Sequence, residues 1–362
     1  MPCKRKLACL LFTCLIYLLY GSSPSLARTG YDALDDSAIP TKSPSKTPLI
    51  AVIRVDQRLI AAGQHGVIII SDDNGLTWTQ VTVPVDLSLT GIYFSSARKG
   101  WAVGHYGTIL QTEDGGITWK KTLTGLDVID ALNVSANEAL KNSPSSPDTK
   151  LKQRVATAYQ AAGPSKPFLA IGKCGGGVLA AGQQDIAMFS SDGGLSWQQW
   201  TSNIDNPHFN NIYTIIQDAN STILVGESGM VLKGDADCKN FKSLQMPYAT
   251  TLLDGMLIGP GTLLLYGIDG NIFKSSDDGT TWKTFSLPVD SVVDSGAMLK
   301  SGRVLLATVG GRLFLSDEEI NNFQELSISE PFQIADMVVA PNGNVIIVGN
   351  GGVSILPFQS LR

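Results

Sequence analysis

One short motif occurs four times in this chain, and it limits the possible fold more than any other feature. The motif reads S/T-x-D-x-G-x-S/T-W, and we call it the Asp box. Its copies span residues 71–78, 112–119, 190–197 and 275–282. A motif that returns at long intervals predicts an array of similar structural units, so the search for further copies comes first.

A glycine-rich lead-in precedes each Asp box and reveals three more copies. It reads G-x-x-G-x-φ-x-x-S/T, where φ is an apolar residue, and it also occurs where the Asp box has decayed. Its first positions are 63, 104, 182, 226, 267, 308 and 349, which gives steps of 41, 78, 44, 41, 41 and 41. Seven units with one insertion and no eighth copy predict a closed ring of seven.

Each unit is expected to hold four short strands. In the second unit we expect them at residues 89–96, 100–103, 108–111 and 118–123, where β-branched and aromatic residues lie between tight turns. A four-stranded unit of roughly 40 residues, repeated, is typical of a propeller blade. The sequence therefore predicts an all-β fold, a seven-bladed β-propeller with Asp-box repeats over residues 48–358.

The Asp boxes themselves are interpreted as structural. Their Ser/Thr and Asp side chains can bond N–H groups of their own turn, the glycine supplies a positive φ, and the tryptophan packs on a neighbouring strand or blade. The alternative, catalytic aspartates or a calcium site, is disfavoured because a catalytic site would be built once. The residues assigned this structural role are Asp73, Trp78, Asp114, Trp119, Asp192, Trp197, Asp277 and Trp282.

The first 27 residues have the pattern of a secretory signal peptide. Basic residues at positions 4–6 precede an apolar run at 7–20, and Ser25-Leu26-Ala27 resembles a cleavage site. The run is too short for a spanning helix. We therefore expect an exported protein, periplasmic or lumenal, with membrane association as an option. Lipidation of Cys9 or Cys14 is the less favoured alternative, because neither cysteine lies in a good lipobox.

Cleavage would remove three basic residues and leave 24 Lys and Arg against 32 Asp and Glu, a formal charge of −8. Such a chain has no basic patch, so nucleic acid is not expected as a partner. Only Cys174 and Cys238 would remain. An oxidising compartment permits a disulfide between them, and two separate buried thiols are the slightly favoured alternative.

Two segments lie outside the repeats. Residues 28–47 are expected to form an N-terminal arm that closes the last blade, because residues 333–358 supply only three strands and a propeller leaves no open edge. Residues 125–167 interrupt the repeat with two stretches of apolar residues at helical spacing, separated by a polar turn at 142–148. This insertion predicts a helical hairpin, either a surface decoration or a recognition element.

Alternating strand directions place the hairpin on the same face as the turns between the second and third strands of each blade. Loops on a rigid scaffold are where binding usually resides, so this face is the candidate binding face. His208 also lies there, but no two histidines have the spacing of metal ligands, so no metal or cofactor is expected. The candidate partner-binding residues are Gln64, His65, His105, Tyr106, Gln184, Asp185, Glu227, Asp269 and Arg312.

The second unit carries a family resemblance. Residues 100–119 read G-W-A-V-G-x-x-G-T-I-L-x-T-x-D-G-G-x-T-W, and this sequence resembles the photosystem II stability/assembly factor family. The resemblance implies a seven-bladed propeller in the thylakoid lumen or periplasm, without enzymatic activity, that binds an early photosystem II reaction-centre subunit. The insertion followed by Gly163-Pro164-Ser-Lys-Pro-Phe168 looks more like bacterial relatives, which favours an envelope-protein assembly role.

The two rival functions are a non-catalytic scaffold and an Asp-box glycoside hydrolase, sialidase-like or xyloglucanase-like. A sialidase needs clustered arginines for a carboxylate, whereas Arg58, Arg98 and Arg303 fall near turns of one face and Arg312 on the other. Six repeats are expected of a sialidase and seven are present. The sequence therefore favours a scaffold that binds a membrane-protein or envelope-complex subunit and no small-molecule substrate.

Overall fold

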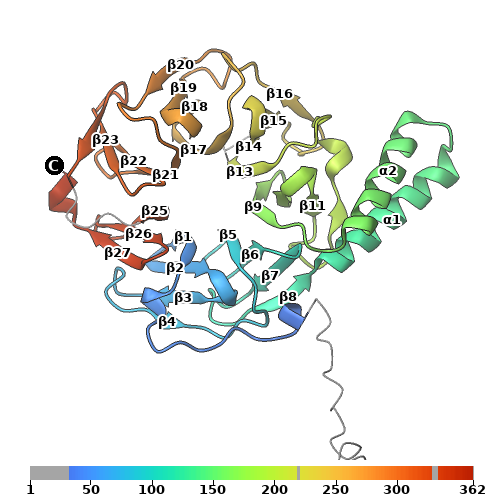
Figure 1. Ribbon diagram of the computed structural model, residues 1–362, viewed down its shortest axis with the longest axis horizontal. Coiled ribbons are helices and arrows are strands. Elements are labelled where there is room, and N and C mark those ends of the chain that lie inside the picture. Colours follow the sequence, from blue (N-terminus) through green and yellow to red (C-terminus); the bar gives the residue numbers. More distant parts are fainter. Residues whose placement is uncertain (1–31, 218–220, 328–332, 362) are drawn as a thin grey trace, which may run out of the picture.

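Seven antiparallel sheets stand around a common axis in the computed structural model, which describes residues 32–217, 221–327 and 333–361 (Figure 1). Six sheets have four strands and the last has three. The all-β, seven-bladed propeller predicted from the repeat count is confirmed. The predicted signal peptide, residues 1–27, lies outside the described residues.

Each blade is one stretch of chain, with its strands in sequence order from the axis outward. Blades 1 and 2 comprise β1 (Leu49–Val55), β2 (Arg58–Gly63), β3 (Ile68–Ser71) and β4 (Thr79–Gln80), then β5 (Leu89–Phe94), β6 (Gly100–Gly104), β7 (Thr108–Thr112) and β8 (Lys120–Leu123). Blades 3 and 4 comprise β9 (Phe168–Cys174), β10 (Gly177–Gly182), β11 (Ala187–Ser190) and β12 (Gln198–Gln199), then β13 (Ile212–Gln217), β14 (Thr222–Gly226), β15 (Val231–Gly234) and β16 (Phe241–Ser243).

Blades 5 to 7 repeat the arrangement. They comprise β17 (Leu252–Gly259), β18 (Thr262–Gly267), β19 (Asn271–Ser275) and β20 (Lys283–Ser286), then β21 (Val293–Met298), β22 (Val304–Thr308), β23 (Leu313–Ser316) and β24 (Phe323–Leu326), and finally β25 (Ile334–Val339), β26 (Val345–Gly349) and β27 (Gly352–Leu356). Second strands such as β6, β14 and β22 are buried throughout. They read as apolar runs because both faces pack on neighbouring blades.

The ring closes by packing and not by a shared strand. The expectation that residues 28–47 supply the missing strand of blade 7 is wrong for the described part of the arm, because the last sheet keeps three strands. A short 3-10 turn, Pro44–Lys46, lies against Gly352 at the start of β27, and the preceding arm bonds to blade 1 through Ala38 N and Val83 O. Apolar side chains of blades 1 and 7, including Val52 and Ile346, share one cluster that joins the ends of the ring.

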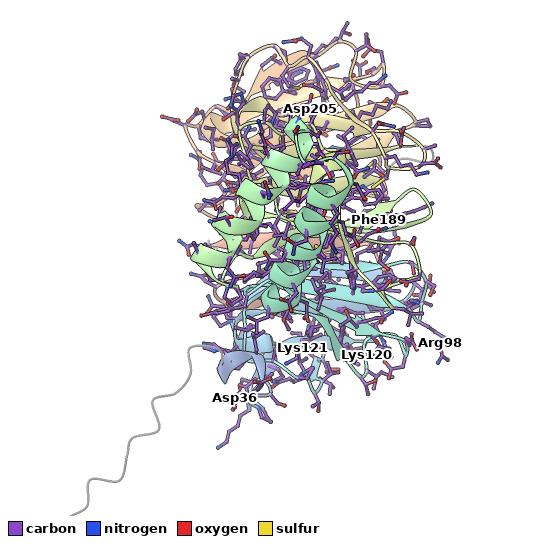
Figure 2. The ribbon with its side chains drawn as sticks, turned by 90° about the vertical axis from the view of Figure 1, so that its right-hand side faces the viewer. Asp36, Arg98, Lys120, Lys121, Phe189 and Asp205 are labelled. Carbon is purple, nitrogen blue, oxygen red and sulfur yellow. A yellow bond between two sulfur atoms is a disulfide. The ribbon has the colours of Figure 1, made fainter. Side chains whose placement is uncertain are left out.

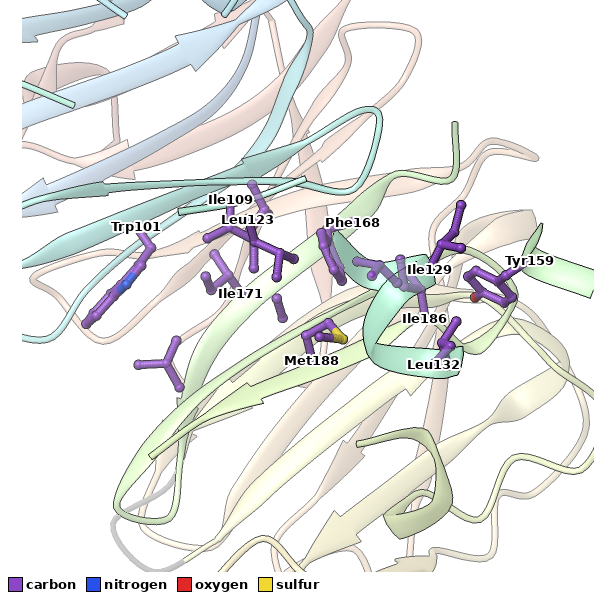
Figure 3. Packing of buried hydrophobic residues seen from close by; sticks show 14 of the residues in the cluster. Trp101, Ile109, Leu123, Ile129, Leu132, Tyr159, Phe168, Ile171, Ile186 and Met188 are labelled. Atoms are coloured by element: carbon purple, nitrogen blue, oxygen red, sulfur yellow. The ribbon is translucent and has the colours of Figure 1, made fainter. Parts of the chain in front are cut away.

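The insertion folds as the predicted helical hairpin, α1 (Gly125–Asn142) and α2 (Pro147–Ala162), which projects from the ring beside blade 3 (Figure 1). Thr124 and Asp127 form a capping box that starts α1. Its base is part of the core, because Ile129, Leu132 and Tyr159 pack with residues of blades 2 and 3 (Figure 3). The hairpin is therefore fixed to the propeller at its base.

The four Asp boxes repeat one hydrogen-bonded turn. In the second, Thr112 Oγ1 donates to Asp114 Oδ1 at 2.8 Å, while the N–H and hydroxyl of Thr118 donate to the same carboxylate at 2.9 and 2.6 Å. Trp119 Nε1 donates to Gly116 O at 3.0 Å, as Trp78 Nε1 does to Gly75 O, whereas Trp197 Nε1 and Trp282 Nε1 have no such partner among the described residues. Bonds from its own turn lower the pKa of the Asp114 carboxyl to about 2, against the opposing effect of burial. The carboxylate's hydrogen-bonding capacity is used within its hairpin.

We expect Asp114→Ala to lower the free energy of unfolding by about 1–3 kcal/mol, because it removes the acceptor of several turn donors. Urea denaturation followed by tryptophan fluorescence measures the change. Glu113→Ala, the neighbouring exposed carboxylate whose Lys120 partner lies 3.9 Å away, is the control and should have little effect. Equal losses from both substitutions would contradict the structural role.

Cys174 and Cys238 form a disulfide that joins blades 3 and 4. Cys174 ends β9 and Cys238 lies in the turn between β15 and β16, and their Cα atoms are 5.6 Å apart. The slightly favoured sequence interpretation, two separate thiols, is wrong. The spacing along the chain gave no sign of the contact, because only the stacking of neighbouring blades brings these two turns together.

Candidate functional site

The two faces of the ring carry different structures. We call the loop face the one formed by turns between second and third strands, connections between blades and the hairpin. The Asp-box face carries the other turns. Hydrogen bonds confirm the grouping on the loop face: His65 Nδ1 lies 2.9 Å from Asp86 Oδ1 of the next connection, and Gly66 N donates to Leu87 O. Figure 2 views the ring edge-on, with the hairpin toward the viewer. It shows Arg98 of the Asp-box face and Asp36 of the arm at opposite edges of the molecule.

The turns between the second and third strands of blades 1 to 5 share one backbone conformation, with a non-glycine residue of positive φ at the same position. The residues at this position are His65 (φ 55°), Tyr106 (54°), Gln184 (49°), Ser228 (56°) and Asp269 (58°). Of the predicted binding residues, Gln64, His65, His105, Gln184 and Asp269 are exposed and Tyr106 is half-buried. They are spread over different blades, so the structure does not gather them into one cleft.

The side chains of three predicted contact residues already form hydrogen bonds with other residues of this chain. Asp185 is 4% exposed and accepts from Asn206 Nδ2 at 3.0 Å. Glu227 accepts from the backbone and side chain of Asn211 at 2.8 and 2.9 Å. Arg312 donates to both carboxylate oxygens of Glu325 at 2.6 and 2.5 Å. The expectation that Asp185 lies exposed for a partner is wrong, since the connection after β12 covers it.

That connection and α2 enclose a groove, which we call the hairpin groove. It consists of two cavities that share Arg154, Val155 and Phe209. The first has a volume of about 330 Å³, and its apolar lining includes Leu132, Leu151 and Ile204. The second has a volume of about 370 Å³, and its lining residues are Arg154, Val155, Ala158, Tyr159, Lys166, Gln184, His208 and Phe209.

The second cavity is electropositive. Arg154, Lys166 and His208 line it and no carboxylate does. The Lys166 ammonium lies 3.6 Å from the ring centroid of Tyr159, and the Arg154 guanidinium lies 5.9 Å from that of Phe209. Burial removes water from the Lys166 ammonium, which disfavours its charged form and lowers its pKa. Within the described residues neither cation has a carboxylate partner.

The axis of the propeller holds a second group of ionisable side chains. Asp254, Asp294 and Asp336 line a central cavity of about 280 Å³. Burial raises the pKa of Asp294 and of Asp336 to about 7. Asp254 accepts from Tyr266 Oη at 2.9 Å, and Asp336 accepts from Val52 N at 2.8 Å across the ring closure. Two of these carboxylates therefore hold backbone and side chains in place.

The described residues contain no group of three or more His, Cys, Asp and Glu side chains arranged to hold a metal ion. None of their helices combines the length and apolarity needed to cross a bilayer.

Comparison with known families matches one segment of the chain. A family model described as "Photosynthesis system II assembly factor YCF48" matches residues 70–139, from β3 through most of α1. The solved structure "YCF48 bound to D1 peptide" shares the fold over 88% of this chain and 94% of that one, with a TM-score of 0.61 and 16% identity. Residues 70–139 are therefore similar to this family, and the chain as a whole shares the propeller fold. Comparison with curated proteins finds no match.

The fold alone is shared more widely than the family. The WD40 propeller domain of Doa1 superposes with a TM-score of 0.60 at 12% identity over 91% of this chain and 99% of that domain. The extracellular domain of a hybrid two component system from B. thetaiotaomicron gives 0.62 at 11% identity, over 88% of this chain and 39% of that one. These likenesses support the architecture and carry no function.

The residues of the hairpin groove that the sequence did not predict are Arg154, Lys166 and Phe209. One signal pointed toward them. The lead-ins at Gly182 and Gly226 are 44 positions apart, whereas later ones are 41 apart, and the extra length falls in the long connection between β12 and β13. Helical spacing predicted α2 but not which side of it would remain uncovered.

Proposed function

We propose that the protein is an exported, non-catalytic scaffold that binds a segment of a membrane-protein or envelope-complex subunit during assembly, through the loop face. The observation that carries this proposal is the hairpin groove. It lies on a rigid ring, where the long insertion between β8 and β9 meets the longest of the other described connections between blades, the one between β12 and β13. Varied loops on a rigid scaffold are the usual place for recognition.

Two further observations support the proposal. The disulfide between Cys174 and Cys238 suits an oxidising compartment such as a periplasm or lumen. A propeller of the same fold has been solved with a D1 peptide bound, which shows that this architecture can present a peptide site. A photosystem II reaction-centre subunit is therefore the first partner to test in a photosynthetic host, and other envelope subunits follow.

The arginines do not support the glycoside hydrolase alternative, because they do not cluster to bind a substrate carboxylate. Arg58 pairs with Asp72 at 2.7 Å, Arg312 pairs with Glu325, and Arg303 donates to Ser316 O at 2.8 Å. Arg58 also donates to Gly115 O of the next blade, and Arg303 also donates to Leu361 O, so each side chain is already bonded within the chain and together they do not form a carboxylate clamp. We expect no turnover of a generic sialoside or of xylo-oligosaccharides; hydrolysis that is lost in Asp294→Asn would instead favour an enzyme.

Site-specific photocrosslinking in intact cells tests the proposed face. A photoreactive residue at Leu151, an exposed position of α2 in the groove lining, should give an adduct with a membrane protein. The matched control is Leu195, which is 75% exposed at the tip of an Asp-box turn and should give none. Adducts from Leu195 alone would assign binding to the Asp-box face, and the absence of membrane-protein adducts from both would contradict the proposed function.

A further inference from the structure

The two cavities of the hairpin groove differ in chemistry although they are continuous. The first offers apolar side chains of both helices and of the connection, including Leu132, Leu151 and Ile204. Its lining also includes the acidic residues Asp148, which is paired with Lys152, Asp185 and Asp205. The second offers Arg154, Lys166 and His208 with the rings of Tyr159 and Phe209. A ligand that fills both must place an apolar group beside an anionic one.

The charge of the second cavity is not balanced from within. Lys152, on the neighbouring turn of α2, is paired with Asp148 at 3.0 Å, but Arg154 and Lys166 have only aromatic rings as described partners. The nearby Asp185 carboxyl does not compensate, because burial raises its pKa to about 8 and keeps it mostly protonated at neutral pH. A half-buried ammonium without a counter-ion gains from an arriving carboxylate.

The walls of the groove are held in position independently of a ligand. Tyr159 Oη donates to Gln184 O at 3.2 Å, which ties α2 to a turn of the loop face. Gln184 N donates to Asn211 Oδ1 at 2.8 Å, and Asn206 fixes the other end of the connection through Asp185. Phe209 has a positive φ of 56°, a costly conformation for a bulky residue, and its ring lines both cavities. A preformed groove loses less entropy when it binds a flexible segment.

We propose that the hairpin groove binds an internal acidic segment of a partner chain, with a large apolar side chain in the first cavity and an adjacent Asp or Glu carboxylate among Arg154, Lys166 and His208. This inference rests on the proposed function and names the chemistry of its ligand. An acidic side chain is chosen over a chain terminus because the charged groups of the cavity are side-chain cations, while a terminal carboxylate is usually captured by a nest of backbone N–H groups.

The probe is a random peptide library displayed with both peptide ends anchored, so that no free carboxyl terminus is present. Selection on the immobilised protein should enrich Asp or Glu next to a large apolar residue. One enriched peptide, synthesised with an amidated end, is then measured by fluorescence anisotropy. The double variant Arg154→Glu/Lys166→Glu should weaken its binding about tenfold or more, because it reverses charges at the carboxylate. The milder pair Arg154→Gln/Lys166→Gln should weaken it in the same direction.

The control is Lys150→Glu, one charge reversal where the double variant makes two, at an exposed position of α2 that lines neither cavity. It should leave binding within about twofold, as expected of a screened surface charge. Equal weakening by Lys150→Glu and by the double variant would indicate general charge attraction and overturn the proposal. So would selection without acidic enrichment, or binding that requires a free terminus.

The two proposals can fail separately. If Leu151 crosslinks to a membrane protein as strongly in Arg154→Gln/Lys166→Gln as in the parent protein, the proposed function stands and the acidic ligand is wrong. If the acidic peptide binds as expected but no membrane-protein adduct forms at the loop face, the groove chemistry stands and the assembly role is wrong. A circular dichroism spectrum and unfolding curve of each variant exclude loss of fold as the cause.

Discussion

Replacing Cys174 and Cys238 together by alanine should lower the free energy of unfolding by about 2–4 kcal/mol. The bridge spans 64 positions of sequence and joins two blades that are otherwise held together by packing and by hydrogen bonds such as that from Trp200 Nε1 to Cys238 O. Closing so long a loop removes conformational entropy from the unfolded chain, and that advantage disappears with the bond. Both cysteines are fully buried in one cluster with Phe189 and Phe241, so the alanines also lose packing.

Urea unfolding with and without a reductant separates the two contributions. Dithiothreitol should destabilise the parent protein and leave the double alanine variant unchanged. Non-reducing peptide mapping should recover a linked pair of peptides that contain Cys174 and Cys238. Recovery of both cysteines as free thiols, with a parent protein insensitive to reductant, would contradict the bridge.

The central aspartates should make the protein more stable at pH 5 than at pH 8.5. Asp294 has its pKa raised from 3.8 to about 7, mainly by burial and then by Asp336 and Asp254. A raised pKa favours folding while the carboxyl is protonated, so this contribution is fully present below about pH 4 and is lost as the pH rises through about 7. The Asp-box carboxylates have the opposite pH dependence. Because their pKa values are lowered, they stabilise the fold above about pH 4, and this contribution is lost as the pH falls below that value.

Asp294→Asn isolates the central contribution. The amide cannot ionise, and Asp294 Oδ1 is a buried atom without a hydrogen-bond partner among the described residues, so few bonds are disturbed. We expect the variant to be more stable than the parent at pH 8.5, by about 1–3 kcal/mol, and to differ less at pH 5. Unfolding curves at the two pH values decide this; a parallel loss at both would mean that the carboxylate is needed for packing.

The sequence predicted the ring well because its repeat records backbone requirements. Every intact Asp box needs a glycine with positive φ, such as Gly116, and a carboxylate such as that of Asp114, so the same residue types recur at the same spacing. The closure was predicted less well. A missing fourth strand suggested that the arm would supply it. Instead the arm bonds to blade 1, only its turn Pro44–Lys46 lies against β27, and the packing of Val52 and Ile346 closes the ring.

The candidate site was only partly predictable for a related reason. The alternating directions of the predicted strands placed Gln184 and the hairpin on one face. In the structure they meet, since Tyr159 Oη of α2 donates a hydrogen bond to Gln184 O. It could not show that the connection after β12 would cover Asp185 or leave Arg154 and Lys166 without carboxylate partners. Those facts depend on how a non-repeating loop folds over a non-repeating hairpin, and no periodicity describes that contact.

Hydrogen exchange of the protein with and without its captured membrane partner tests the central claim most directly, that the loop face binds through the hairpin groove. We expect slower exchange in α2 and in residues 200–211 when the partner is bound, because binding covers the groove and suppresses local opening. The Asp-box turns around Gly75 and Gly194 should be unchanged. Protection of those turns, with unaltered exchange in α2 and residues 200–211, would contradict the account.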